Sequence, residues 1–475
     1  MNPSHALHHA RTHRAQFISE LKEFLCIPSV SSHPERKDDM TRCAKWLARH
    51  LRQIGLERAR VVPTQGNPLV YASHRRRKDK PTLLIYGHYD VLPGEPLAKW
   101  STPPFSPTIK GSDLYARGAS DDKGQLFCHV KAIESFLRTQ GSLPVNVKCL
   151  FEGEEEVGST HLLPFIARHK NALRADAAVI SDTRMLAPGR PAISYAQRGG
   201  LRAELEVRGA REELHSGAFG GAVLNPIQAL CEIIAGLHDK NGRIPIPHFY
   251  EDVRNSSEQE RDSIARNGPS DVQILQDANI LRGWGESGYT LFERTTIRPA
   301  LTLNGIVGGH HGPGGKGVIP TRALAKLSFR LVPDQDPAKI AELFRAHIVR
   351  ISPKEVNVRV RTFSPIKPAV IDRNHPAVQA AAFAYKKGFG AAPVFLPSGG
   401  SIPVVSAFSE HLQIPTALMG FGLPDDRMHA PNEKFHLPNF FRGIETCIWY
   451  LAAIASALDP GKAIVDPASE WEVPA

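Results

Sequence analysis

The sequence is poor in cysteine and contains no long apolar run. Its six cysteines include no Cys-x-x-Cys pair, which argues against a disulfide framework and against a thiolate zinc site. No apolar stretch reaches the roughly 18 residues that span a bilayer, and the His- and Arg-rich N-terminus lacks the apolar segment of a signal peptide. These absences predict a cytoplasmic protein with reduced thiols and no membrane partner.

Charge of one sign does not dominate the chain. It carries 58 basic and 48 acidic residues, for a formal net charge of +10. The densest basic run, residues 75–78, contains no aromatic side chain on which a base could stack. We therefore expect no nucleic-acid partner.

Apolar runs that alternate with amphipathic segments predict a mainly parallel sheet with flanking helices, and thus an α/β protein. The chain of 475 residues is long enough for two or more domains. The expected strands are residues 82–86, 145–151, 177–180 and 416–419. The expected helices are residues 16–25, 40–54, 124–139, 377–385 and 440–458.

The pattern changes in the middle of the chain. Residues 201–208, 326–331 and 356–361 alternate strictly between apolar and polar, which is typical of strands with one solvated face. Amphipathic helices are expected at residues 226–237 and 337–351. We predict one discontinuous domain of residues 1–197 and 367–475, ending in a polar tail after Asp459, and an inserted α+β domain of residues 198–366.

Histidine and acidic residues follow the predicted parallel strands. Taken singly, each has an ordinary interpretation: a run of glutamates is usually a solvated surface, and paired aspartates usually cap a helix. However, the carboxyl ends of parallel strands meet at one crevice. Acidic groups gathered there would repel one another unless a cation lay between them. The groups concerned are His88 and Asp90, Asp121, residues 154–156, Asp182 and His429.

Imidazole and carboxylate donors without thiolates suit Zn²⁺, Mn²⁺ or Co²⁺. Two such ions require one bridging carboxylate and two further ligands each, which is a number of groups that this chain offers. A remaining carboxylate could then serve as a general base, and another could orient a histidine ligand. The sequence therefore predicts a site for two divalent ions per subunit, most simply zinc.

These segments together resemble the ordered motifs of the M20 metallopeptidases, with the greatest likeness to the cytosolic non-specific dipeptidase or carnosine dipeptidase branch. The resemblance runs from about Phe17 to Leu458. It rests on His88-Tyr89-Asp90, Gly118-Ala119-Ser120-Asp121-Asp122-Lys123-Gly124, Glu154-Glu155-Glu156-Val157-Gly158-Ser159, Ser181-Asp182 and Asp425-Asp426-Arg427-Met428-His429. It continues in Glu213-Leu214-His215-Ser216-Gly217, Val318-Ile319-Pro320, Phe329-Arg330-Leu331-Val332-Pro333 and Gly399-Gly400-Ser401-Ile402-Pro403.

The resemblance implies a role for each matching residue near the metals. Asp121 would bridge the ions, and Glu155 would be the general base acting on a metal-bridging water. Asp90 would fix the tautomer of His88. The remaining ligands would be His88 and Asp182 for one ion, and Glu156 and His429 for the other. The peptide bond between Asp121 and Asp122 would be cis.

The resemblance also assigns residues of the inserted domain, which would serve as a lid and dimerisation domain. His215 would reach the oxyanion from the partner subunit of a homodimer, and Arg330 would bind the terminal carboxylate of the substrate. Ser401, which follows the inserted domain in the sequence, would also lie at the substrate. The ordinary interpretations are a loop histidine for His215 and a solvated strand face for Arg330. Gly317 departs from the family pattern, where threonine is usual, and this leaves the exact substrate open.

The implied function is hydrolysis of dipeptides or short peptides. An N-acyl amino-acid deacylase or a carboxypeptidase of the same family would use the same metals, so these alternatives stay open. A catalytically silent binding or scaffold protein is an alternative from another class, but such a protein would be expected to lack some of the ligands.

Overall fold

The computed structural model of the chain describes residues 1–74 and 77–458. Two residues of the basic run and the predicted polar tail lie outside the described residues. The chain forms two compact units: one contains Met1–Tyr195, Ile371–Leu396 and the described residues from Ile402 onward, and the other contains Ala196–Val370 and Pro397–Ser401. Within the described ranges, no helix combines the length and apolar character needed to cross a membrane.

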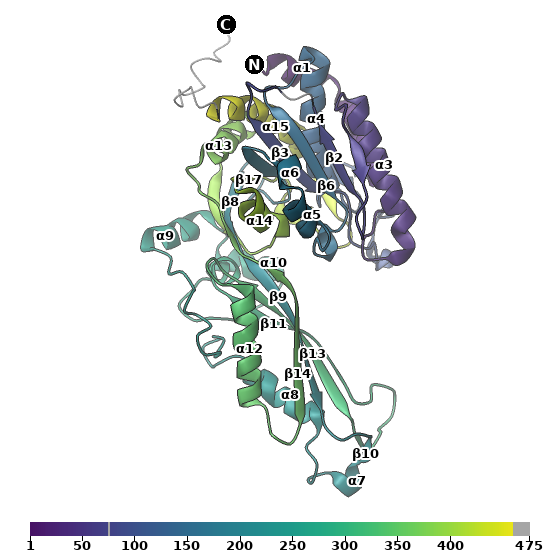
Figure 1. Cartoon of the computed structure of the whole chain (residues 1–475), viewed down its shortest axis with the longest axis vertical. Coiled ribbons are helices and arrows are strands. Elements are labelled where there is room, and N and C mark those ends of the chain that lie inside the picture. Colours follow the sequence, from purple (N-terminus) through teal and green to yellow (C-terminus); the bar gives the residue numbers. More distant parts are fainter. Residues whose placement is uncertain (75–76, 459–475) are drawn as a thin grey trace. The chain divides into compact units, whose positions relative to one another are not determined.

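The first unit is built on a six-stranded sheet with the order β1-β2-β6-β3-β7-β17 (Figure 1). Four neighbouring strands, β6, β3, β7 and β17, run parallel to one another. Strand β2 is antiparallel to both of its neighbours, β6 and β1. The strands are β1 (Arg60–Val62), β2 (Leu69–Ser73), β3 (Thr82–His88), β6 (Asn146–Glu152), β7 (Ala177–Ile180) and β17 (Thr416–Leu418). The predicted mainly parallel sheet is confirmed, and the short strands β1 and β2 were not predicted.

The carboxyl ends of the parallel strands lie at one edge of this sheet. His88, the last residue of β3, pairs with Glu152, the last residue of β6. On the other side of β3, Tyr86 pairs with Ile180, which ends β7. Loops that leave these strands therefore begin side by side.

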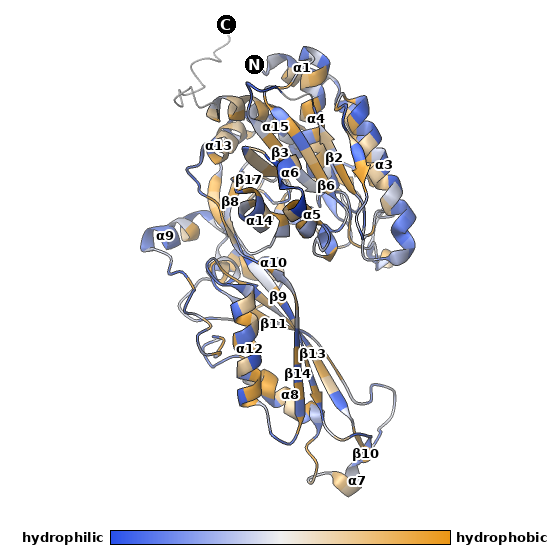
Figure 2. Ribbon diagram, in the orientation of Figure 1, coloured by the Kyte–Doolittle hydropathy of each residue, from blue (hydrophilic) through white to orange (hydrophobic). Residues whose placement is uncertain are grey.

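Helices cover the sheet because each has an apolar face to bury. The central helix α4 (Lys123–Gln140) is buried over most of its length, between β3 and its neighbours α1, α2 and α15. In α3 (Lys37–Gln53), which packs on β1 and β2, buried apolar residues alternate with hydrophilic ones (Figure 2). The other helices of this unit are α1 (Ser4–Thr12), α2 (Arg14–Leu25), α5 (Leu162–Arg168), α6 (Lys170–Leu173), α13 (Pro376–Phe389), α14 (Pro403–Ala407) and α15 (Leu437–Ala457).

The second unit contains a four-stranded antiparallel sheet with the order β11-β13-β9-β14. The strands are β9 (Gly199–Arg208), β11 (Ala300–Gly308), β13 (Arg322–Leu331) and β14 (Asn357–Ile366). Helices α8 (Pro226–Ala235) and α12 (Pro337–Ile351) pack on this sheet. The alternating apolar residues of β9 and β13 form the core together with the buried apolar residues of the two helices. The antiparallel sheet and both helices are confirmed. Strand β11 was not predicted, because it is largely exposed and contains glycine at Gly305.

Shorter elements complete the two units. Strands β8 (Ala192–Gln197), β15 (Ala369–Val370) and β16 (Val394–Ser398) form a small sheet with the order β15-β8-β16. In the first unit, β4 (Thr108–Lys110), β5 (Asp113–Tyr115) and β18 (Lys434–His436) form another. The second unit also contains β10 (Leu214–His215), α7 (Ser216–Phe219), α9 (Glu258–Asn267), α10 (Asp271–Ala278), α11 (Leu291–Thr296) and β12 (Val318–Ile319).

Candidate metal centre

Two groups of metal-ligating side chains share the carboxylate of Asp121. His88 and Asp182 belong to the first group, and Glu156 and His429 belong to the second; in each group the donor atoms lie within 4.8 Å of one another. The Oδ1 atom of Asp121 lies 3.1 Å from His88 Nε2, and its Oδ2 atom lies 2.8 Å from His429 Nε2. Each oxygen thus faces a different group, which is the arrangement that a carboxylate bridging two cations requires.

The hydrogen bonds of His88 select its tautomer. Its Nδ1 lies 3.0 Å from the main-chain oxygen of Asp90. A carbonyl oxygen can only accept, so Nδ1 carries a proton, and Nε2 is the nitrogen that faces the shared donor groups, where it could bind a cation in place of its own proton. The ring is fully buried, so this orientation is maintained by its surroundings.

The carboxylate of Asp90 also orients the acidic segment that follows β6. Its two oxygens accept hydrogen bonds from the main-chain N–H groups of Glu155 and Glu156, both at 3.2 Å. Asp90 therefore contacts two parts of the site: the ring of His88, with Oδ1 3.3 Å from Nδ1, and the turn Glu155–Val157.

Several acidic side chains of the site are buried close to one another. Burial is the largest cause that raises the pKa of Glu155 to about 7 and of Glu156 to about 9, and the charge of Asp121 adds to it. The same causes raise the pKa of Asp182 well above its usual range. Although burial opposes its ionisation, hydrogen bonds from His429 and His88 lower the pKa of Asp121. Divalent cations would relieve this repulsion, and the oxygen and imidazole donors suit zinc, manganese or cobalt.

Glu155 differs from the other acidic residues at this edge. Its carboxylate belongs to neither donor group, and it accepts no hydrogen bond from any described residue. The peptide bond between Asp121 and Asp122, on the neighbouring loop, is cis. Among the described residues, the carboxylate of Glu155 is therefore without a hydrogen-bonded partner, whereas the neighbouring Glu152 and Asp122 each have one oxygen that accepts a hydrogen bond and one that does not.

In the second unit, Arg330 and Ser401 lie together. Arg330 Nη1 donates to Ser401 Oγ at 3.0 Å, and Ser401 Oγ donates to the main-chain oxygen of Arg198 at 2.5 Å. Arg198 is itself buried and donates only to main-chain oxygens, among them that of Gly399 at 3.1 Å. Among the described residues, neither arginine pairs with a carboxylate, so this cluster suits an anionic ligand.

His215 is exposed, and one of its nitrogens has a partner. Nδ1 accepts a hydrogen bond from the main-chain N–H of Gly217 at 3.1 Å. The neutral ring therefore carries its proton on Nε2, which is left as a donor. His215 pairs with Val318 in β10 and β12, at the opposite end of β13 from Arg330.

Three further residues, which were not predicted from the sequence, contact Ser401 or the loop that carries Asp121. Glu433 and Asp426 accept hydrogen bonds from the loop that carries Asp121, and Arg198 holds Ser401. Glu433 follows His429 by only four residues, but no periodicity marks a carboxylate that is buried within a loop. The short distance from His429 along the sequence was the one signal that pointed to Glu433.

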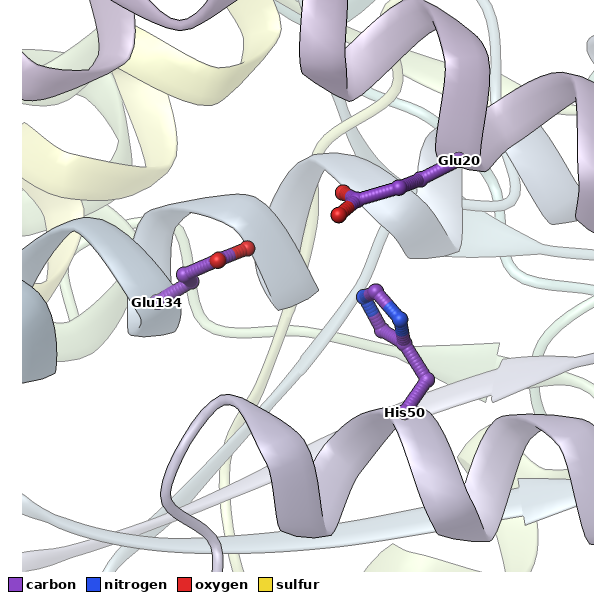
Figure 3. Close-up of side chains that lie close together, drawn as sticks. All are labelled: Glu20, His50 and Glu134. Carbon is purple, nitrogen blue, oxygen red and sulfur yellow. The ribbon is translucent and has the colours of Figure 1, made fainter.

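A third cluster, formed by Glu20, His50 and Glu134, points at a common centre (Figure 3). The ammonium group of Lys131 lies among these side chains, 2.7 Å from Glu134 Oε2, 2.9 Å from His50 Nε2 and in contact with Glu20. Lys131 is fully buried. A lysine side chain thus already occupies the centre of this cluster, which sets it apart from the two groups at Asp121.

We predict that Lys131→Met lowers the free energy of unfolding by about 3–5 kcal/mol, because it leaves buried carboxylates without their cation. The control is Lys45→Met, on the exposed face of α3, which should change stability by less than about 0.5 kcal/mol. Urea denaturation followed by circular dichroism measures both. Equal midpoints for the two variants would contradict the prediction.

The first unit thus defines an α/β protein with two overlapping His/carboxylate groups at the carboxyl edge of a parallel sheet, a class suited to holding two divalent ions. The model of peptidase family M20/M25/M40 matches residues 84–453, and the chain belongs to this family. It is a metallopeptidase. The family implies a dinuclear metal site, and side chains suited to one are present.

Relatives with similar sequences cover nearly the whole chain. The Cys-Gly metallodipeptidase dug1 of Schizosaccharomyces pombe is 31% identical over 458 residues, 93% of this chain and 96% of that protein. The Beta-Ala-His dipeptidase of Mus musculus is 30% identical over 454 residues, 92% of each chain. Among solved structures, the M20 family metallo-carboxypeptidase Sso-CP2 from Sulfolobus solfataricus is 35% identical, with a TM-score of 0.83 over 92% of this chain and 98% of that one.

Proposed function

We propose that this protein hydrolyses the amide bond of dipeptides or short peptides with a free terminal carboxylate, using two divalent ions, most simply zinc. The observation that carries the proposal is the pair of donor groups that share Asp121, with the unpartnered carboxylate of Glu155 beside them. His88 and Asp182 would hold one ion, and Glu156 and His429 the other. The dipeptidase names of two relatives support the substrate class.

When bound, the two ions would polarise the scissile carbonyl and make water acidic enough to attack at neutral pH. Glu155 accepts the proton of the attacking water and returns it to the leaving nitrogen, so its carboxylate must stay free of other hydrogen bonds. Asp90 maintains His88 in the tautomer that directs Nε2 at the site, and it orients Glu155 through the main chain.

Arg330 binds the terminal carboxylate of the substrate. A guanidinium group matches a carboxylate geometrically, and no carboxylate of the described chain competes for this one. Ser401 Oγ donates its hydrogen bond to the main-chain oxygen of Arg198, so the hydroxyl oxygen is free to accept from Arg330. Ser401 thus takes part in substrate binding by orienting the guanidinium group.

His215 acts in the partner subunit of a homodimer. Its Nε2–H would donate to the oxyanion that forms as the carbonyl is attacked. His215 lies beyond the start of β13 and Arg330 near its end, and the eight residue steps from Arg322 to Arg330 span about 26 Å at 3.3 Å per step. A dipeptide is only about 7 Å long, so His215 and Arg330 of one chain cannot both contact the same dipeptide.

This assignment gives the two parts of the chain different tasks. Residues 1–197 and 367–475 would form the di-metal catalytic domain, and residues 198–366 the lid and dimerisation domain. The edge strand β11 exposes Leu303, Ile306 and Val307, which favours its pairing with a second copy. The six cysteines are free, which favours a cytoplasmic location.

A substrate panel tests the proposal. Purified protein loaded with Zn²⁺, Mn²⁺ or Co²⁺ is assayed on Ala-Ala, β-Ala-His, Cys-Gly, a dipeptide amide, N-acetyl amino acids and longer peptides. Dipeptides should be cleaved fastest, and amidation of the carboxylate should reduce kcat/KM strongly. Preference for N-acetyl amino acids would indicate a deacylase. Release of single C-terminal residues from longer peptides would indicate a carboxypeptidase, the alternative that the likeness to Sso-CP2 favours.

Mixing two inactive variants tests the role of His215. We expect His215→Ala and Glu155→Gln to be inactive separately and to recover part of the activity when mixed. A heterodimer would then have one site with both defects and one with neither. The control is subunit exchange, followed by mass spectrometry of differently labelled chains. Exchange without recovery would mean that His215 acts within its own chain or not at all.

A further inference from the structure

We propose that Glu433 is a positioning residue that holds Asp121 where both metal ions can reach it. This inference rests on the proposed function, because it assumes that Asp121 is the bridging ligand. Glu433 is fully buried, four residues after His429. It touches no donor atom of the two metal groups, so it acts through the loop between β5 and α4.

The carboxylate of Glu433 receives four hydrogen bonds from that loop. Oε1 accepts from the main-chain N–H groups of Ser120 and Asp121, both at 3.0 Å. Oε2 accepts from the N–H of Gly118 at 3.0 Å and from Arg117 Nη1 at 2.8 Å. Its main-chain oxygen also accepts from the N–H of Ala116 at 3.1 Å.

The loop needs this support because neither helix nor sheet dictates its course. Strand β5 ends at Tyr115 and helix α4 begins at Lys123, so the residues between them have no regular ladder of hydrogen bonds. Gly118 adopts φ +85°, and a Cβ atom there would lie only 2.7 Å from Val91 Cγ1. Four buried N–H donors arranged around one carboxylate impose a single course on the chain.

A second contact joins the same two segments. The hydroxyl of Ser120 donates to Asp426 Oδ2 at 2.6 Å. The segment that supplies His429 therefore contacts the Asp121 loop at two points. One is Asp426, before His429 in the sequence, and the other is Glu433, after it. We infer that the 2.8 Å approach of His429 Nε2 to Asp121 Oδ2 depends on this connection.

A matched pair of variants tests the inference. Glu433→Gln keeps the size of the side chain but replaces one acceptor oxygen with an amide donor, which opposes two of the four N–H groups. Glu154→Gln is the control: Glu154 is also buried and also accepts a main-chain N–H, that of Asn67 at 2.9 Å, but it lies in neither metal group. Zn²⁺ and Mn²⁺ affinity is measured by competition with a chromophoric chelator.

We expect Glu433→Gln to weaken metal binding about 10- to 100-fold, as supporting partners of metal ligands usually do, with turnover recovering as Mn²⁺ is raised to saturation. Glu154→Gln should bind metal as the unmodified protein does. Unchanged affinity in folded Glu433→Gln overturns the inference. Absence of metal binding by the unmodified protein would instead overturn the proposed function.

Glu433→Asp provides a second test if the glutamine variant does not fold. It preserves the charge that pairs with Arg117 but shortens the reach to the loop, so metal affinity should again fall while the fold is retained. Circular dichroism establishes folding in each case. Failure of both variants to fold would show that Glu433 supports the fold in general, and this too overturns a specific positioning role.

Discussion

Glu155→Gln is expected to retain both metal ions and to lose about 10²–10⁴ in kcat, since proton transfer by a positioned carboxylate contributes that much. Glutamine has nearly the same shape but cannot accept the proton of the attacking water. Glu155 belongs to neither donor group, so its replacement should leave the ligands in place. The measurements are kcat on the best dipeptide and metal content by mass spectrometry.

The neighbouring residue provides the control for this prediction. Glu154 accepts hydrogen bonds from the N–H groups of Asn67 and His161, so it supports a different loop. Glu154→Gln should keep kcat within a few-fold of the unmodified enzyme. Near-normal kcat in Glu155→Gln would remove Glu155 from the mechanism. Loss of metal from that variant would instead identify Glu155 as a ligand.

Asp121→Ala is expected to abolish activity together with metal binding, because each donor group then keeps only two side chains. A metal ion whose free concentration is 100 times its Kd stabilises the folded state by about 2.7 kcal/mol, and the variant should lose this stabilisation. A chelator should therefore lower the melting temperature of the unmodified protein but not that of Asp121→Ala. Calorimetry with and without chelator measures the difference.

Asp113→Ala serves as the control for the loss of a partly buried aspartate. Asp113 on β5 pairs with His436, with Oδ1 2.9 Å from Nδ1, and lies outside both donor groups. This variant should keep its metal and its response to chelator. Two metal ions per chain in Asp121→Ala would contradict the bridging assignment, and a single retained ion would show that the two groups bind independently.

Local pattern was sufficient to predict most of the longer helices and strands, but not most of the shorter elements. The apolar run at residues 177–180 and the amphipathic segment at residues 337–351 coincide with β7 and α12, because a buried strand and a half-buried helix each impose their own period. The exposed strand β11 escaped prediction because its residues show no regular alternation, and the short buried strands β2 and β8 escaped because their runs are too brief to show a period.

The sequence by itself also determined that acidic groups and histidines follow the parallel strands, and thus that His88 and Asp182 begin from the same edge of the sheet. Only the tertiary structure decided how these side chains are held. That Asp121 presents one oxygen to His88 and the other to His429 depends on loops whose course is set by Glu433 and Asp426, more than 300 residues away along the chain. Hydrogen bonds between such distant segments leave no local period in a sequence, because they depend on how the whole unit packs.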